Sequence, residues 1–227
     1  MGFTEADLLA FSLTLKLAGI TTLILLLIGT PIAWWLAHSR FRFKFLIEGL
    51  IALPLVLPPT VLGFYLLIAL GPQGPFAEVL NWFGVNTLAF SFTGLVIGSV
   101  FYSMPFVVQP LQNAFASIGT RPLEVAATLG ASPLDRFFSV ALPLAKPAFI
   151  TAAVLGFAHT LGEFGVVLMI GGNIPGETQV LSIAIYDHVE AMDYANAHLI
   201  SGSLLLLSFL MLITVFGVNR RFRTMSL

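Results

Sequence analysis

Five stretches of this chain are each long and apolar enough to cross a lipid bilayer as a helix. Because the hydrocarbon core of a bilayer is about 30 Å thick and an α-helix rises about 1.5 Å per residue, a crossing needs about 20 mostly apolar residues. The predicted spans are residues 12–37, 45–70, 93–112, 148–170 and 200–218. We therefore expect an all-α, polytopic membrane protein with a single domain over residues 1–227.

The composition agrees with a membrane protein and argues against several other classes. Hydrophobic residues make up 58% of the chain and charged residues 9%, whereas soluble domains are about a quarter charged. A net charge of −1 provides no basic surface for nucleic acid. The chain has no cysteine, and its four histidines lack the spacing of metal ligands, so we expect no metal or other cofactor in this chain. The first apolar stretch is too long for the core of a cleaved signal peptide, so we expect it to be retained.

The basic residues are expected to lie on one side of the membrane. They follow the first, third and fifth spans, while the connections at 71–92 and 171–199 contain none. The nine residues concerned are Arg40, Arg42, Lys44, Arg121, Arg136, Lys146, Arg220, Arg221 and Arg223. The remaining one, Lys16, is placed near the outer end of the first span, where its ammonium can reach the interface. Since Lys and Arg are retained in the cytoplasm, we expect the N-terminus outside and the C-terminus inside.

The connection between the third and fourth spans, residues 113–147, is polar and interrupted by prolines. Gly130 can take the left-handed conformation that ends a helix, which predicts one short helix over 122–129. A serine followed by proline at Ser132 can begin a second short helix over 133–141. Isolated helices below about 12–15 residues are marginal in water, so both must pack against something.

The first of these short helices carries small residues. Ala126, Ala127 and Gly130 would let the backbone or side chains of another protein approach closely. The alternative is a re-entrant loop or an amphipathic helix that lies on the lipid surface. The residues alone leave both interpretations open.

The fourth predicted span contains an ionisable residue, Glu163, and such a residue inside a span suggests a functional site. Gly156, Thr160 and Glu163 are spaced to share one helix face, with Gly162 beside them, and we expect this face to line a translocation path. The alternative is that the glycines allow close helix packing and that Glu163 pairs with a hydroxyl or backbone group.

Prolines interrupt the second predicted span. Pro54, Pro58 and Pro59 remove backbone donors and must bend or unwind the helix. A break is tolerated only where protein or a water-filled cavity satisfies the freed carbonyl groups. We expect either a simple kink or a second element of the path, formed by Pro58 and Pro59.

The polar connection carries landmarks at fixed spacing: Glu124, Gly130, Val140 and the pair Leu142-Pro143. This pattern resembles the EAA signature of the membrane subunits of ABC importers, which reads E-A-A, three residues, G, nine residues, I-x-L-P. Two positions depart from it conservatively, Val125 in place of alanine and Val140 in place of isoleucine. The resemblance implies the type I permease fold, a prokaryotic inner-membrane location and docking of this loop into an ATPase. The residues implied for coupling are Glu124, Ala126, Ala127, Gly130, Ala131, Leu142 and Pro143.

Three further strings resemble the oxyanion branch of the same family: LGEFG at 161–165, GGNIPGET at 171–178 and PLVLPPTVLG at 54–63. The resemblance implies import of molybdate or tungstate, with sulfate or thiosulfate as the alternative. It also implies a homodimer of this chain, two ATP-binding cassette subunits that hold ATP and Mg²⁺, and an extracytoplasmic oxyanion-binding protein. The chain has no GxxxxGK[ST] phosphate loop, so we expect it not to be an enzyme.

The charges predict how an anion would reach the path. No Lys or Arg lies inside a predicted span except Lys16, so we expect a path of hydroxyls and backbone N–H groups without a tight anion site. The outer connections carry acidic residues and no basic ones, which disfavours direct capture of a free anion. These residues are Glu78, Glu177, Asp187, Glu190 and Asp193. Residues 183–197 are expected to form either a short external helix of a docking surface or a solvated helix.

Two other classes fit less well. In an ion-coupled secondary transporter Glu163 would bind the proton or cation, but such folds usually show paired internal repeats, and none is visible. In an intramembrane enzyme Glu163 and His159 would act as acid and base, but no nucleophile or metal group accompanies them.

Overall fold

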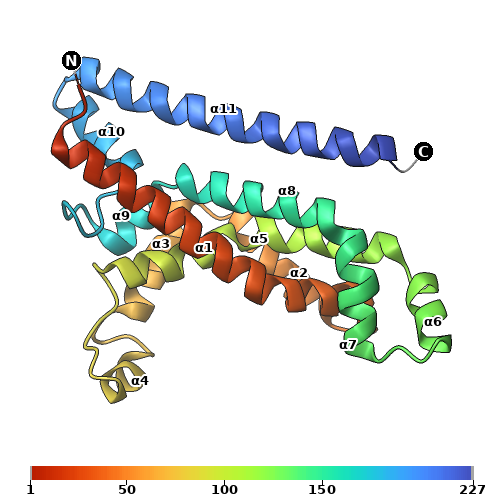
Figure 1. The fold of residues 1–227 in the computed structure, drawn as a ribbon. Helices are drawn as coiled ribbons and strands as arrows, with labels where there is room; N and C mark the ends of the chain where they lie inside the picture. Colours follow the sequence, from red (N-terminus) through yellow and green to blue (C-terminus); the bar gives the residue numbers. More distant parts are fainter. Residues whose placement is uncertain (1, 226–227) are drawn as a thin grey trace.

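The computed structural model describes the backbone of residues 2–225 and the side chains of residues 2–217, so the basic side chains of Arg220, Arg221 and Arg223 fall outside the described part. In chain order the elements are α1 (Glu5–His38), α2 (Lys44–Ala52), the 3₁₀ helix η1 (Leu53–Leu55), α3 (Pro59–Leu70), α4 (Ala77–Trp82), α5 (Phe92–Ile118), α6 (Arg121–Thr128), α7 (Pro133–Arg136), the π-helix η2 (Phe137–Ala141), α8 (Leu142–Leu161), α9 (Gly165–Gly171), α10 (Leu181–Glu190) and α11 (Tyr194–Met225) (Figure 1). The expected all-α class is confirmed.

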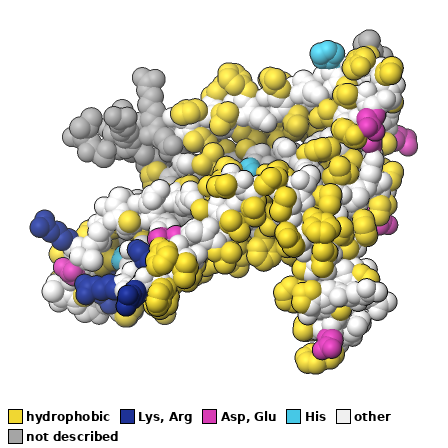
Figure 2. All heavy atoms as spheres, turned by 180° about the vertical axis from the view of Figure 1, so that it is seen from behind, with side chains coloured by type: hydrophobic (Ala, Val, Ile, Leu, Met, Phe, Trp, Pro, Cys, Tyr) yellow, Lys and Arg dark blue, Asp and Glu magenta, His cyan; other side chains and the backbone are white. Residues whose placement is uncertain are grey.

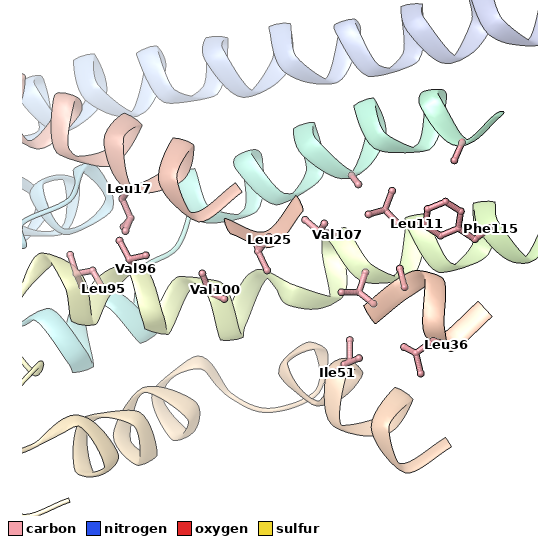
Figure 3. Close-up of a cluster of buried hydrophobic side chains, with 14 of the residues drawn as sticks. Leu17, Leu25, Leu36, Ile51, Leu95, Val96, Val100, Val107, Leu111 and Phe115 are labelled. Atoms are coloured by element: carbon pink, nitrogen blue, oxygen red, sulfur yellow. The ribbon is translucent and has the colours of Figure 1, made fainter. Parts of the chain in front are cut away.

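The core is formed by three long helices, α1, α5 and α8. Figure 3 shows Leu17 of α1 beside Leu95 and Val96 of α5, and Leu25 of α1 beside Val107 of α5. All of these side chains are buried. The apolar contacts run along the whole length of α1 and α5, which fixes these two helices side by side and leaves α11 as the most peripheral long helix (Figure 1).

The number of predicted spans agrees with the structure, but two of the spans are not continuous. Within the described residues, four helices are long and apolar enough to cross a membrane, and a bent pair of shorter helices makes a fifth crossing if it is counted as one. The long helices are Glu5–His38, Phe92–Ile118, Pro133–Leu161 and Tyr194–Gly217.

The second predicted span, 45–70, is broken. Lys44–Leu55 and Pro59–Leu70 meet at an angle of 110°. Proline disfavours the helical conformation of the residue before it, and Pro58 itself precedes a proline, so it adopts an extended backbone with φ −54° and ψ 134°. The prolines therefore make a sharp turn here and not the straight crossing that the span prediction assumed.

The fourth predicted span, 148–170, is wrong at both ends. Its helix is already continuous from Pro133 and stops at Leu161, and α9 follows as a separate helix after a break at residues 162–164. The second short helix predicted over 133–141 is therefore the beginning of this span. The π-helix Phe137–Ala141 makes the join, with Leu142 N–H donating to the Phe137 carbonyl.

Proline explains the π-helix. Pro143 cannot donate a backbone hydrogen bond, and its ring would clash with the carbonyl four residues earlier in a regular α-helix. A wider π-turn just before Pro143 leaves room for the ring without ending the helix. The helix break that the sequence predicts at Pro143 is thus replaced by a local widening.

The charges lie at opposite ends of the molecule. Figure 2 shows Lys and Arg side chains gathered at one end and most of the acidic side chains at the other. In Figure 1 the C-terminus, α6 and α7 lie at one end, while the N-terminus, α9 and α10 lie at the other. The fold thus brings the basic residues after the first and third spans to the end that carries α6.

Candidate functional site

Helix α6 projects from the end of the bundle (Figure 1). None of its residues is buried. It ends in a Schellman motif, in which Gly130 N–H donates to the Ala127 carbonyl at 3.0 Å and Ala131 N–H donates to the Ala126 carbonyl at 3.0 Å. Gly130 has a φ of +87°, the left-handed conformation that the sequence predicts for it. The turn after α6 is therefore fixed by its own backbone.

The surface around this turn is apolar and exposed. Leu129 is 83% exposed and Leu134 is 72% exposed, with Val125 also exposed on α6. Glu124 and Ala127 are exposed as well. A hollow of about 320 Å³ lies between α6 and the following helix, lined by Ala126, Leu129, Gly130, Ala131, Asp135, Ser139 and Val140. Exposed apolar groups around a small hollow are typical of a protein docking surface.

The second helix of this segment begins as the sequence predicts. Ser132 Oγ accepts from Asp135 N–H at 3.2 Å, and Pro133 occupies the first turn. In a full capping box the Asp135 side chain would also accept from the Ser132 backbone N–H. Here the Asp135 carboxylate accepts from Ser139 Oγ at 2.7 Å instead. Leu142 and Pro143 lie in the first turn of α8, directly after the π-helix.

An aromatic cluster joins the π-helix to the long helices. The Phe137 ring lies 5.0 Å from Trp34 of α1 and 6.1 Å from Phe115 of α5, measured between ring centroids. Phe115 in turn lies 6.1 Å from Phe149 of α8. These ring contacts link the π-helix that follows α7 to α1, α5 and α8.

A chain of hydrogen bonds connects α8 to α5. Thr160 Oγ1 donates to the Gly156 carbonyl at 3.0 Å, Ser103 Oγ lies 2.9 Å from Thr160 Oγ1, and His159 Nδ1 lies 2.9 Å from Ser103 Oγ. A hydroxyl has one proton, and the carbonyl can only accept, so Ser103 donates to Thr160 and His159 Nδ1–H donates to Ser103. Thr160 and Gly156 therefore face α5 inside the protomer. A Cβ on Gly156 would lie 2.6 Å from Val107 Cγ2.

The two helix breaks lie next to each other. A Cβ on Gly165, at the start of α9, would lie 2.7 Å from the Pro59 Cβ at the start of α3. This contact brings the turn at Pro58 and Pro59 beside the break at 162–164. Pro58 and Gly162 are exposed in the protomer, whereas Glu163 is 3% exposed. The predicted path residues thus fall into two groups. Pro58, Pro59 and Gly162 lie at the two helix breaks, whereas Gly156, Thr160 and Glu163 are buried.

The acid and base of the enzyme interpretation do not meet. The Nδ1 atom of His159 is engaged by Ser103, and its ring stacks on Phe106 with centroids 3.9 Å apart. Glu163 lies beyond the end of α8, and among the described ion pairs none joins it to His159. We find no geometry for proton transfer between them.

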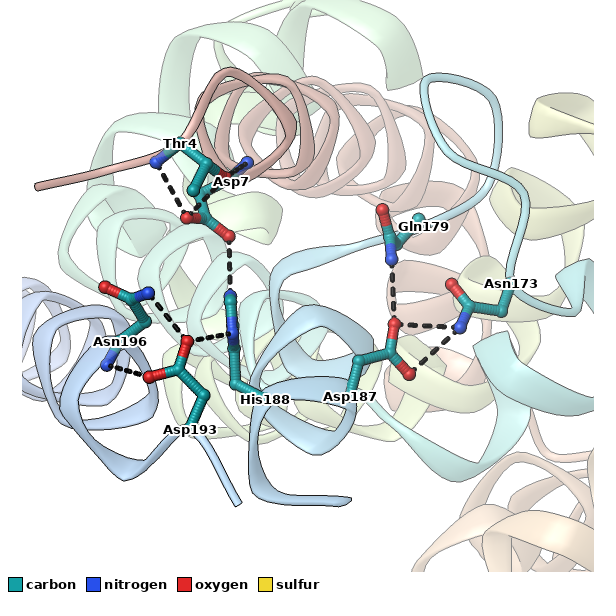
Figure 4. Close-up of polar contacts among 8 residues, drawn as sticks. All are labelled: Thr4, Asp7, Asn173, Gln179, Asp187, His188, Asp193 and Asn196. Atoms are coloured by element: carbon teal, nitrogen blue, oxygen red, sulfur yellow. Dashed lines mark hydrogen bonds and ion pairs between the residues drawn. The ribbon is translucent and has the colours of Figure 1, made fainter. Parts of the chain in front are cut away.

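The opposite end of the bundle is held together by a polar network (Figure 4). His188 of α10 donates through Nε2 to the Asp7 carboxylate of α1 at 3.0 Å, and its Nδ1 lies 3.4 Å from Asp193. The pKa of His188 is raised above its ordinary value, mainly by the hydrogen bond to Asp7. The hydrogen bond from Asn196 lowers the pKa of the Asp193 carboxyl. This network ties α1, α10 and α11 together.

The His188 network predicts a pH-dependent stability. Because folding raises the pKa of His188, its stabilisation is complete below the ordinary value of about 6.5 and is lost as the pH rises through the folded value. We expect the unfolding temperature of the wild-type chain to fall relative to His188→Gln as the pH rises above about 6.5 and passes the raised pKa of His188. Thermal unfolding in detergent measures this, with His198→Gln, an exposed histidine of α11, as the control. Identical pH profiles for wild type and His188→Gln would contradict the expectation.

Beside this network, a second acidic residue holds the connection between α9 and α10. The Asp187 carboxylate accepts from Asn173 at 2.8 and 3.0 Å and from Gln179 at 2.8 Å (Figure 4). Residues 183–197 were expected to form one short helix, but only 183–190 belong to α10, and a break at 191–193 separates them from Tyr194, where α11 begins. The connection is therefore an ordered surface at this end of the molecule.

Comparison with known proteins identifies the family. The family of binding-protein-dependent transport system inner membrane components matches residues 29–224. The chain belongs to this family. This description and the apolar helices agree with a multi-pass inner-membrane subunit of a transport system.

Individual relatives are similar to this chain, a transport permease, over most of its length. It is 61% identical over 223 residues to the molybdenum transport system permease protein ModB of Azotobacter vinelandii, which covers 98% of each chain. It is 33% identical over 213 residues to the sulfate transport system permease protein CysT of Salmonella typhimurium, which covers 94% of this chain and 76% of the relative. Its fold is similar to a chain of a bacterial ABC transporter involved in the import of alginate, with a TM-score of 0.74, 18% identity, and coverage of 98% of this chain and 80% of that one.

Sequence reasoning missed part of the polar cluster in this permease. Ser99 and Ser103 are fully buried on α5 and face the end of α8. Their spacing of four residues within an apolar span was a visible signal for a polar stripe. The network of Asp7, His188 and Asp193 was also missed, because its members are far apart in the sequence.

Proposed function

We propose that this chain forms the membrane pathway of an ATP-driven importer for a tetrahedral oxyanion, molybdate or its analogue tungstate. One observation supports this substrate above sulfate: identity of 61% across 98% of both chains with the molybdenum permease relative, against 33% with the sulfate relative. The alternative cargo, sulfate or thiosulfate, has the same charge and geometry. It is therefore the competitor that a transport experiment must include.

In each copy of the chain, the segment from Glu124 to Pro143 is the site where one of the two ATP-binding cassette subunits docks. These subunits hold ATP and Mg²⁺, and this chain does not hydrolyse ATP. The exposed turn at Gly130, the small residues Ala126, Ala127 and Ala131, and the aromatic contact from Phe137 to Trp34 support this role. ATP-driven closure of the cassette subunits would displace α6, and the packed rings would carry that displacement into α1, α5 and α8.

Two copies of this chain assemble around the path. Much of α8 and α11 is not buried within one protomer, and the breaks at Pro58-Pro59 and at Gly162 lie next to each other, with Pro58 and Gly162 exposed. Interrupted helices line binding sites in other transporters, because unwound backbone can face a cavity there. We place the path along these two breaks, with Gly156, Thr160 and Glu163 supporting it from inside the protomer.

We propose that the N-terminus lies outside and that α6 lies in the cytoplasm. The clustering of basic side chains at the α6 end supports this orientation. The outer end presents acidic residues, so the anion is delivered by an extracytoplasmic oxyanion-binding protein. Lipid covers the outward faces of the long helices, which carry exposed leucine and phenylalanine side chains such as Leu205 and Phe209.

Uptake of radiolabelled molybdate into proteoliposomes tests this function. The chain is reconstituted with its cassette subunits and binding protein, and we expect uptake that vanadate abolishes and an uncoupler leaves unchanged. Excess tungstate should compete, whereas sulfate at the same excess should not. Uptake that an uncoupler abolishes would favour an ion-coupled transporter, and full competition by sulfate would reassign the cargo.

A further inference from the structure

Glu163 is a buried carboxyl group without a partner. Its side chain is 3% exposed, and neither of its carboxyl oxygens has a hydrogen-bond partner among the side chains that the structure describes. This burial is already complete in one protomer, so assembly with other subunits can only maintain or increase it. An unpartnered buried polar group requires a physical explanation.

The elements around Glu163 supply no positive charge. On α5, Ser99 and Tyr102 lie close to the carboxyl, but the Ser99 hydroxyl does not reach hydrogen-bond geometry. On α8, His159 directs its Nδ1 proton to Ser103. On α10, Tyr186 packs its ring against Phe164 and donates its hydroxyl proton to Glu190.

Titratable side chains on the other helices are engaged elsewhere or exposed. On α1, the Lys16 ammonium lies 4.7 Å from the centroid of the Phe92 ring. On α3 and α11, Tyr65 and His198 are exposed. The structure describes no group of three His, Cys, Asp or Glu residues that could hold a metal ion. Glu163 therefore has neither a counter-ion nor a ligand set for a metal cation in the described part of the chain.

The backbone of the same residue is firmly held. Ser182 Oγ of α10 donates to the Glu163 carbonyl at 2.6 Å, directly at the break between α8 and α9. The side chain extends toward α5, where the buried hydroxyl of Ser99 has no hydrogen-bond partner among the described residues. Glu163 thus lies between α10 and α5 at the point where the fourth span changes direction.

An ionised carboxylate in this place would be costly. Burying a charge without a partner costs several kcal/mol, and the bilayer interior adds no compensating water. Adding a proton removes the charge and creates an O–H donor for a neighbouring hydroxyl. A neutral carboxylic acid accounts for both the absence of a counter-ion and the open hydroxyl of Ser99.

We propose that Glu163 is a proton-binding site and that its neutral carboxylic acid fixes the break between α8 and α9 against α5. The proton comes from water, and no other bond changes. Glu163 is a positioning residue here, because it holds the break in place and does not contact the transported anion in this conformation. A conformational change that opens the break to water would allow the proton to leave.

Infrared difference spectroscopy on the full chain in lipid nanodiscs tests this proposal. We expect a carboxylic-acid C=O band at neutral pH that shifts in D₂O and is lost in Glu163→Gln. The control is Glu78→Gln, which changes an exposed carboxylate and should leave the band unchanged. A second measurement needs no variant: the band of the wild-type chain should disappear at alkaline pH as the acid ionises.

Two results would overturn the proposal. One is a wild-type spectrum without the acid band at neutral pH, and the other is a band that persists in Glu163→Gln. A carboxylate band that depends on added Na⁺ would assign the site to a metal cation. None of these outcomes depends on the cargo, so they leave the proposed import function to its own test.

Discussion

Replacing Leu129 with aspartate is expected to release the ATP-binding cassette subunits while the permease stays folded. Leu129 is 83% exposed beside the turn at Gly130, and α6 contributes no buried residue to the protomer. An unpaired carboxylate buried in an apolar contact costs more than about 1.4 kcal/mol, which corresponds to about tenfold in affinity. Co-purification of the cassette subunits should therefore fall by about tenfold or more, and ATP-dependent uptake should fall with it.

A matched control lies at the other end of the molecule. Met192 is 77% exposed and has a φ of +58°, a conformation that aspartate tolerates comparatively well. Met192→Asp should retain the cassette subunits at the wild-type level. Equal loss of the subunits in both variants would point to general instability, and unchanged capture in Leu129→Asp would remove α6 from the docking surface.

Replacing Gly63 with valine is expected to separate α3 from α9 and destabilise the broken span. A Cβ at this position would lie 2.7 Å from Met169 Cβ and 3.2 Å from the backbone Cα of Val166, so the backbone of α9 would have to move. Overpacking of this kind typically costs about 1–3 kcal/mol. The free energy of unfolding in detergent should fall by about that amount.

Gly49 provides the control for this substitution. It lies in α2, the other half of the same broken span, and a Cβ there meets no atom within 4 Å. Since valine is intrinsically a slightly better helix former than glycine, Gly49→Val should leave the free energy of unfolding unchanged or raise it slightly. Equal destabilisation by both variants would show that valine in the span is harmful for a reason other than the contact with α9.

The segment around Gly130 and Ser132, which we propose as the docking site, was the most predictable part of the structure. Gly130 adopts the left-handed turn, Ser132 caps the next helix, and α6 ends within one residue of the predicted 129. These features depend on local backbone chemistry, which a short sequence contains almost completely. Local signals therefore sufficed where a segment makes few tertiary contacts.

The number of spans was predicted correctly, but the sequence did not show that two of them are each broken into two helices. Apolar length cannot distinguish one helix from two halves, and the angle of 110° at Pro58 depends on how α3 packs against α9. The join at residues 137–141 was missed because a π-turn lets the helix pass Pro143, whereas a proline usually predicts an end. The prolines produced both departures, and apolar length alone does not show how a proline redirects or widens a helix.

Helix periodicity placed Gly156, Thr160 and Glu163 on a common face but did not show what that face meets. In the structure Thr160 bonds to Ser103 and Gly156 packs against Val107, both on α5. A small polar face is equally suited to a tight helix contact and to an aqueous path. Only the arrangement of the neighbouring helix distinguishes them, and that arrangement depends on contacts more than fifty residues apart in the sequence.

A single cysteine at Ala127 tests the central claim most directly. The chain has no cysteine of its own, so Ala127→Cys provides one reactive thiol on the exposed face of α6. In the assembled transporter we expect a short bifunctional reagent to cross-link it to an ATP-binding cassette subunit. Labelling of this thiol by a membrane-impermeant reagent from outside the cell, or by a lipid-soluble reagent within the bilayer, would contradict the assignment of α6 as the coupling element.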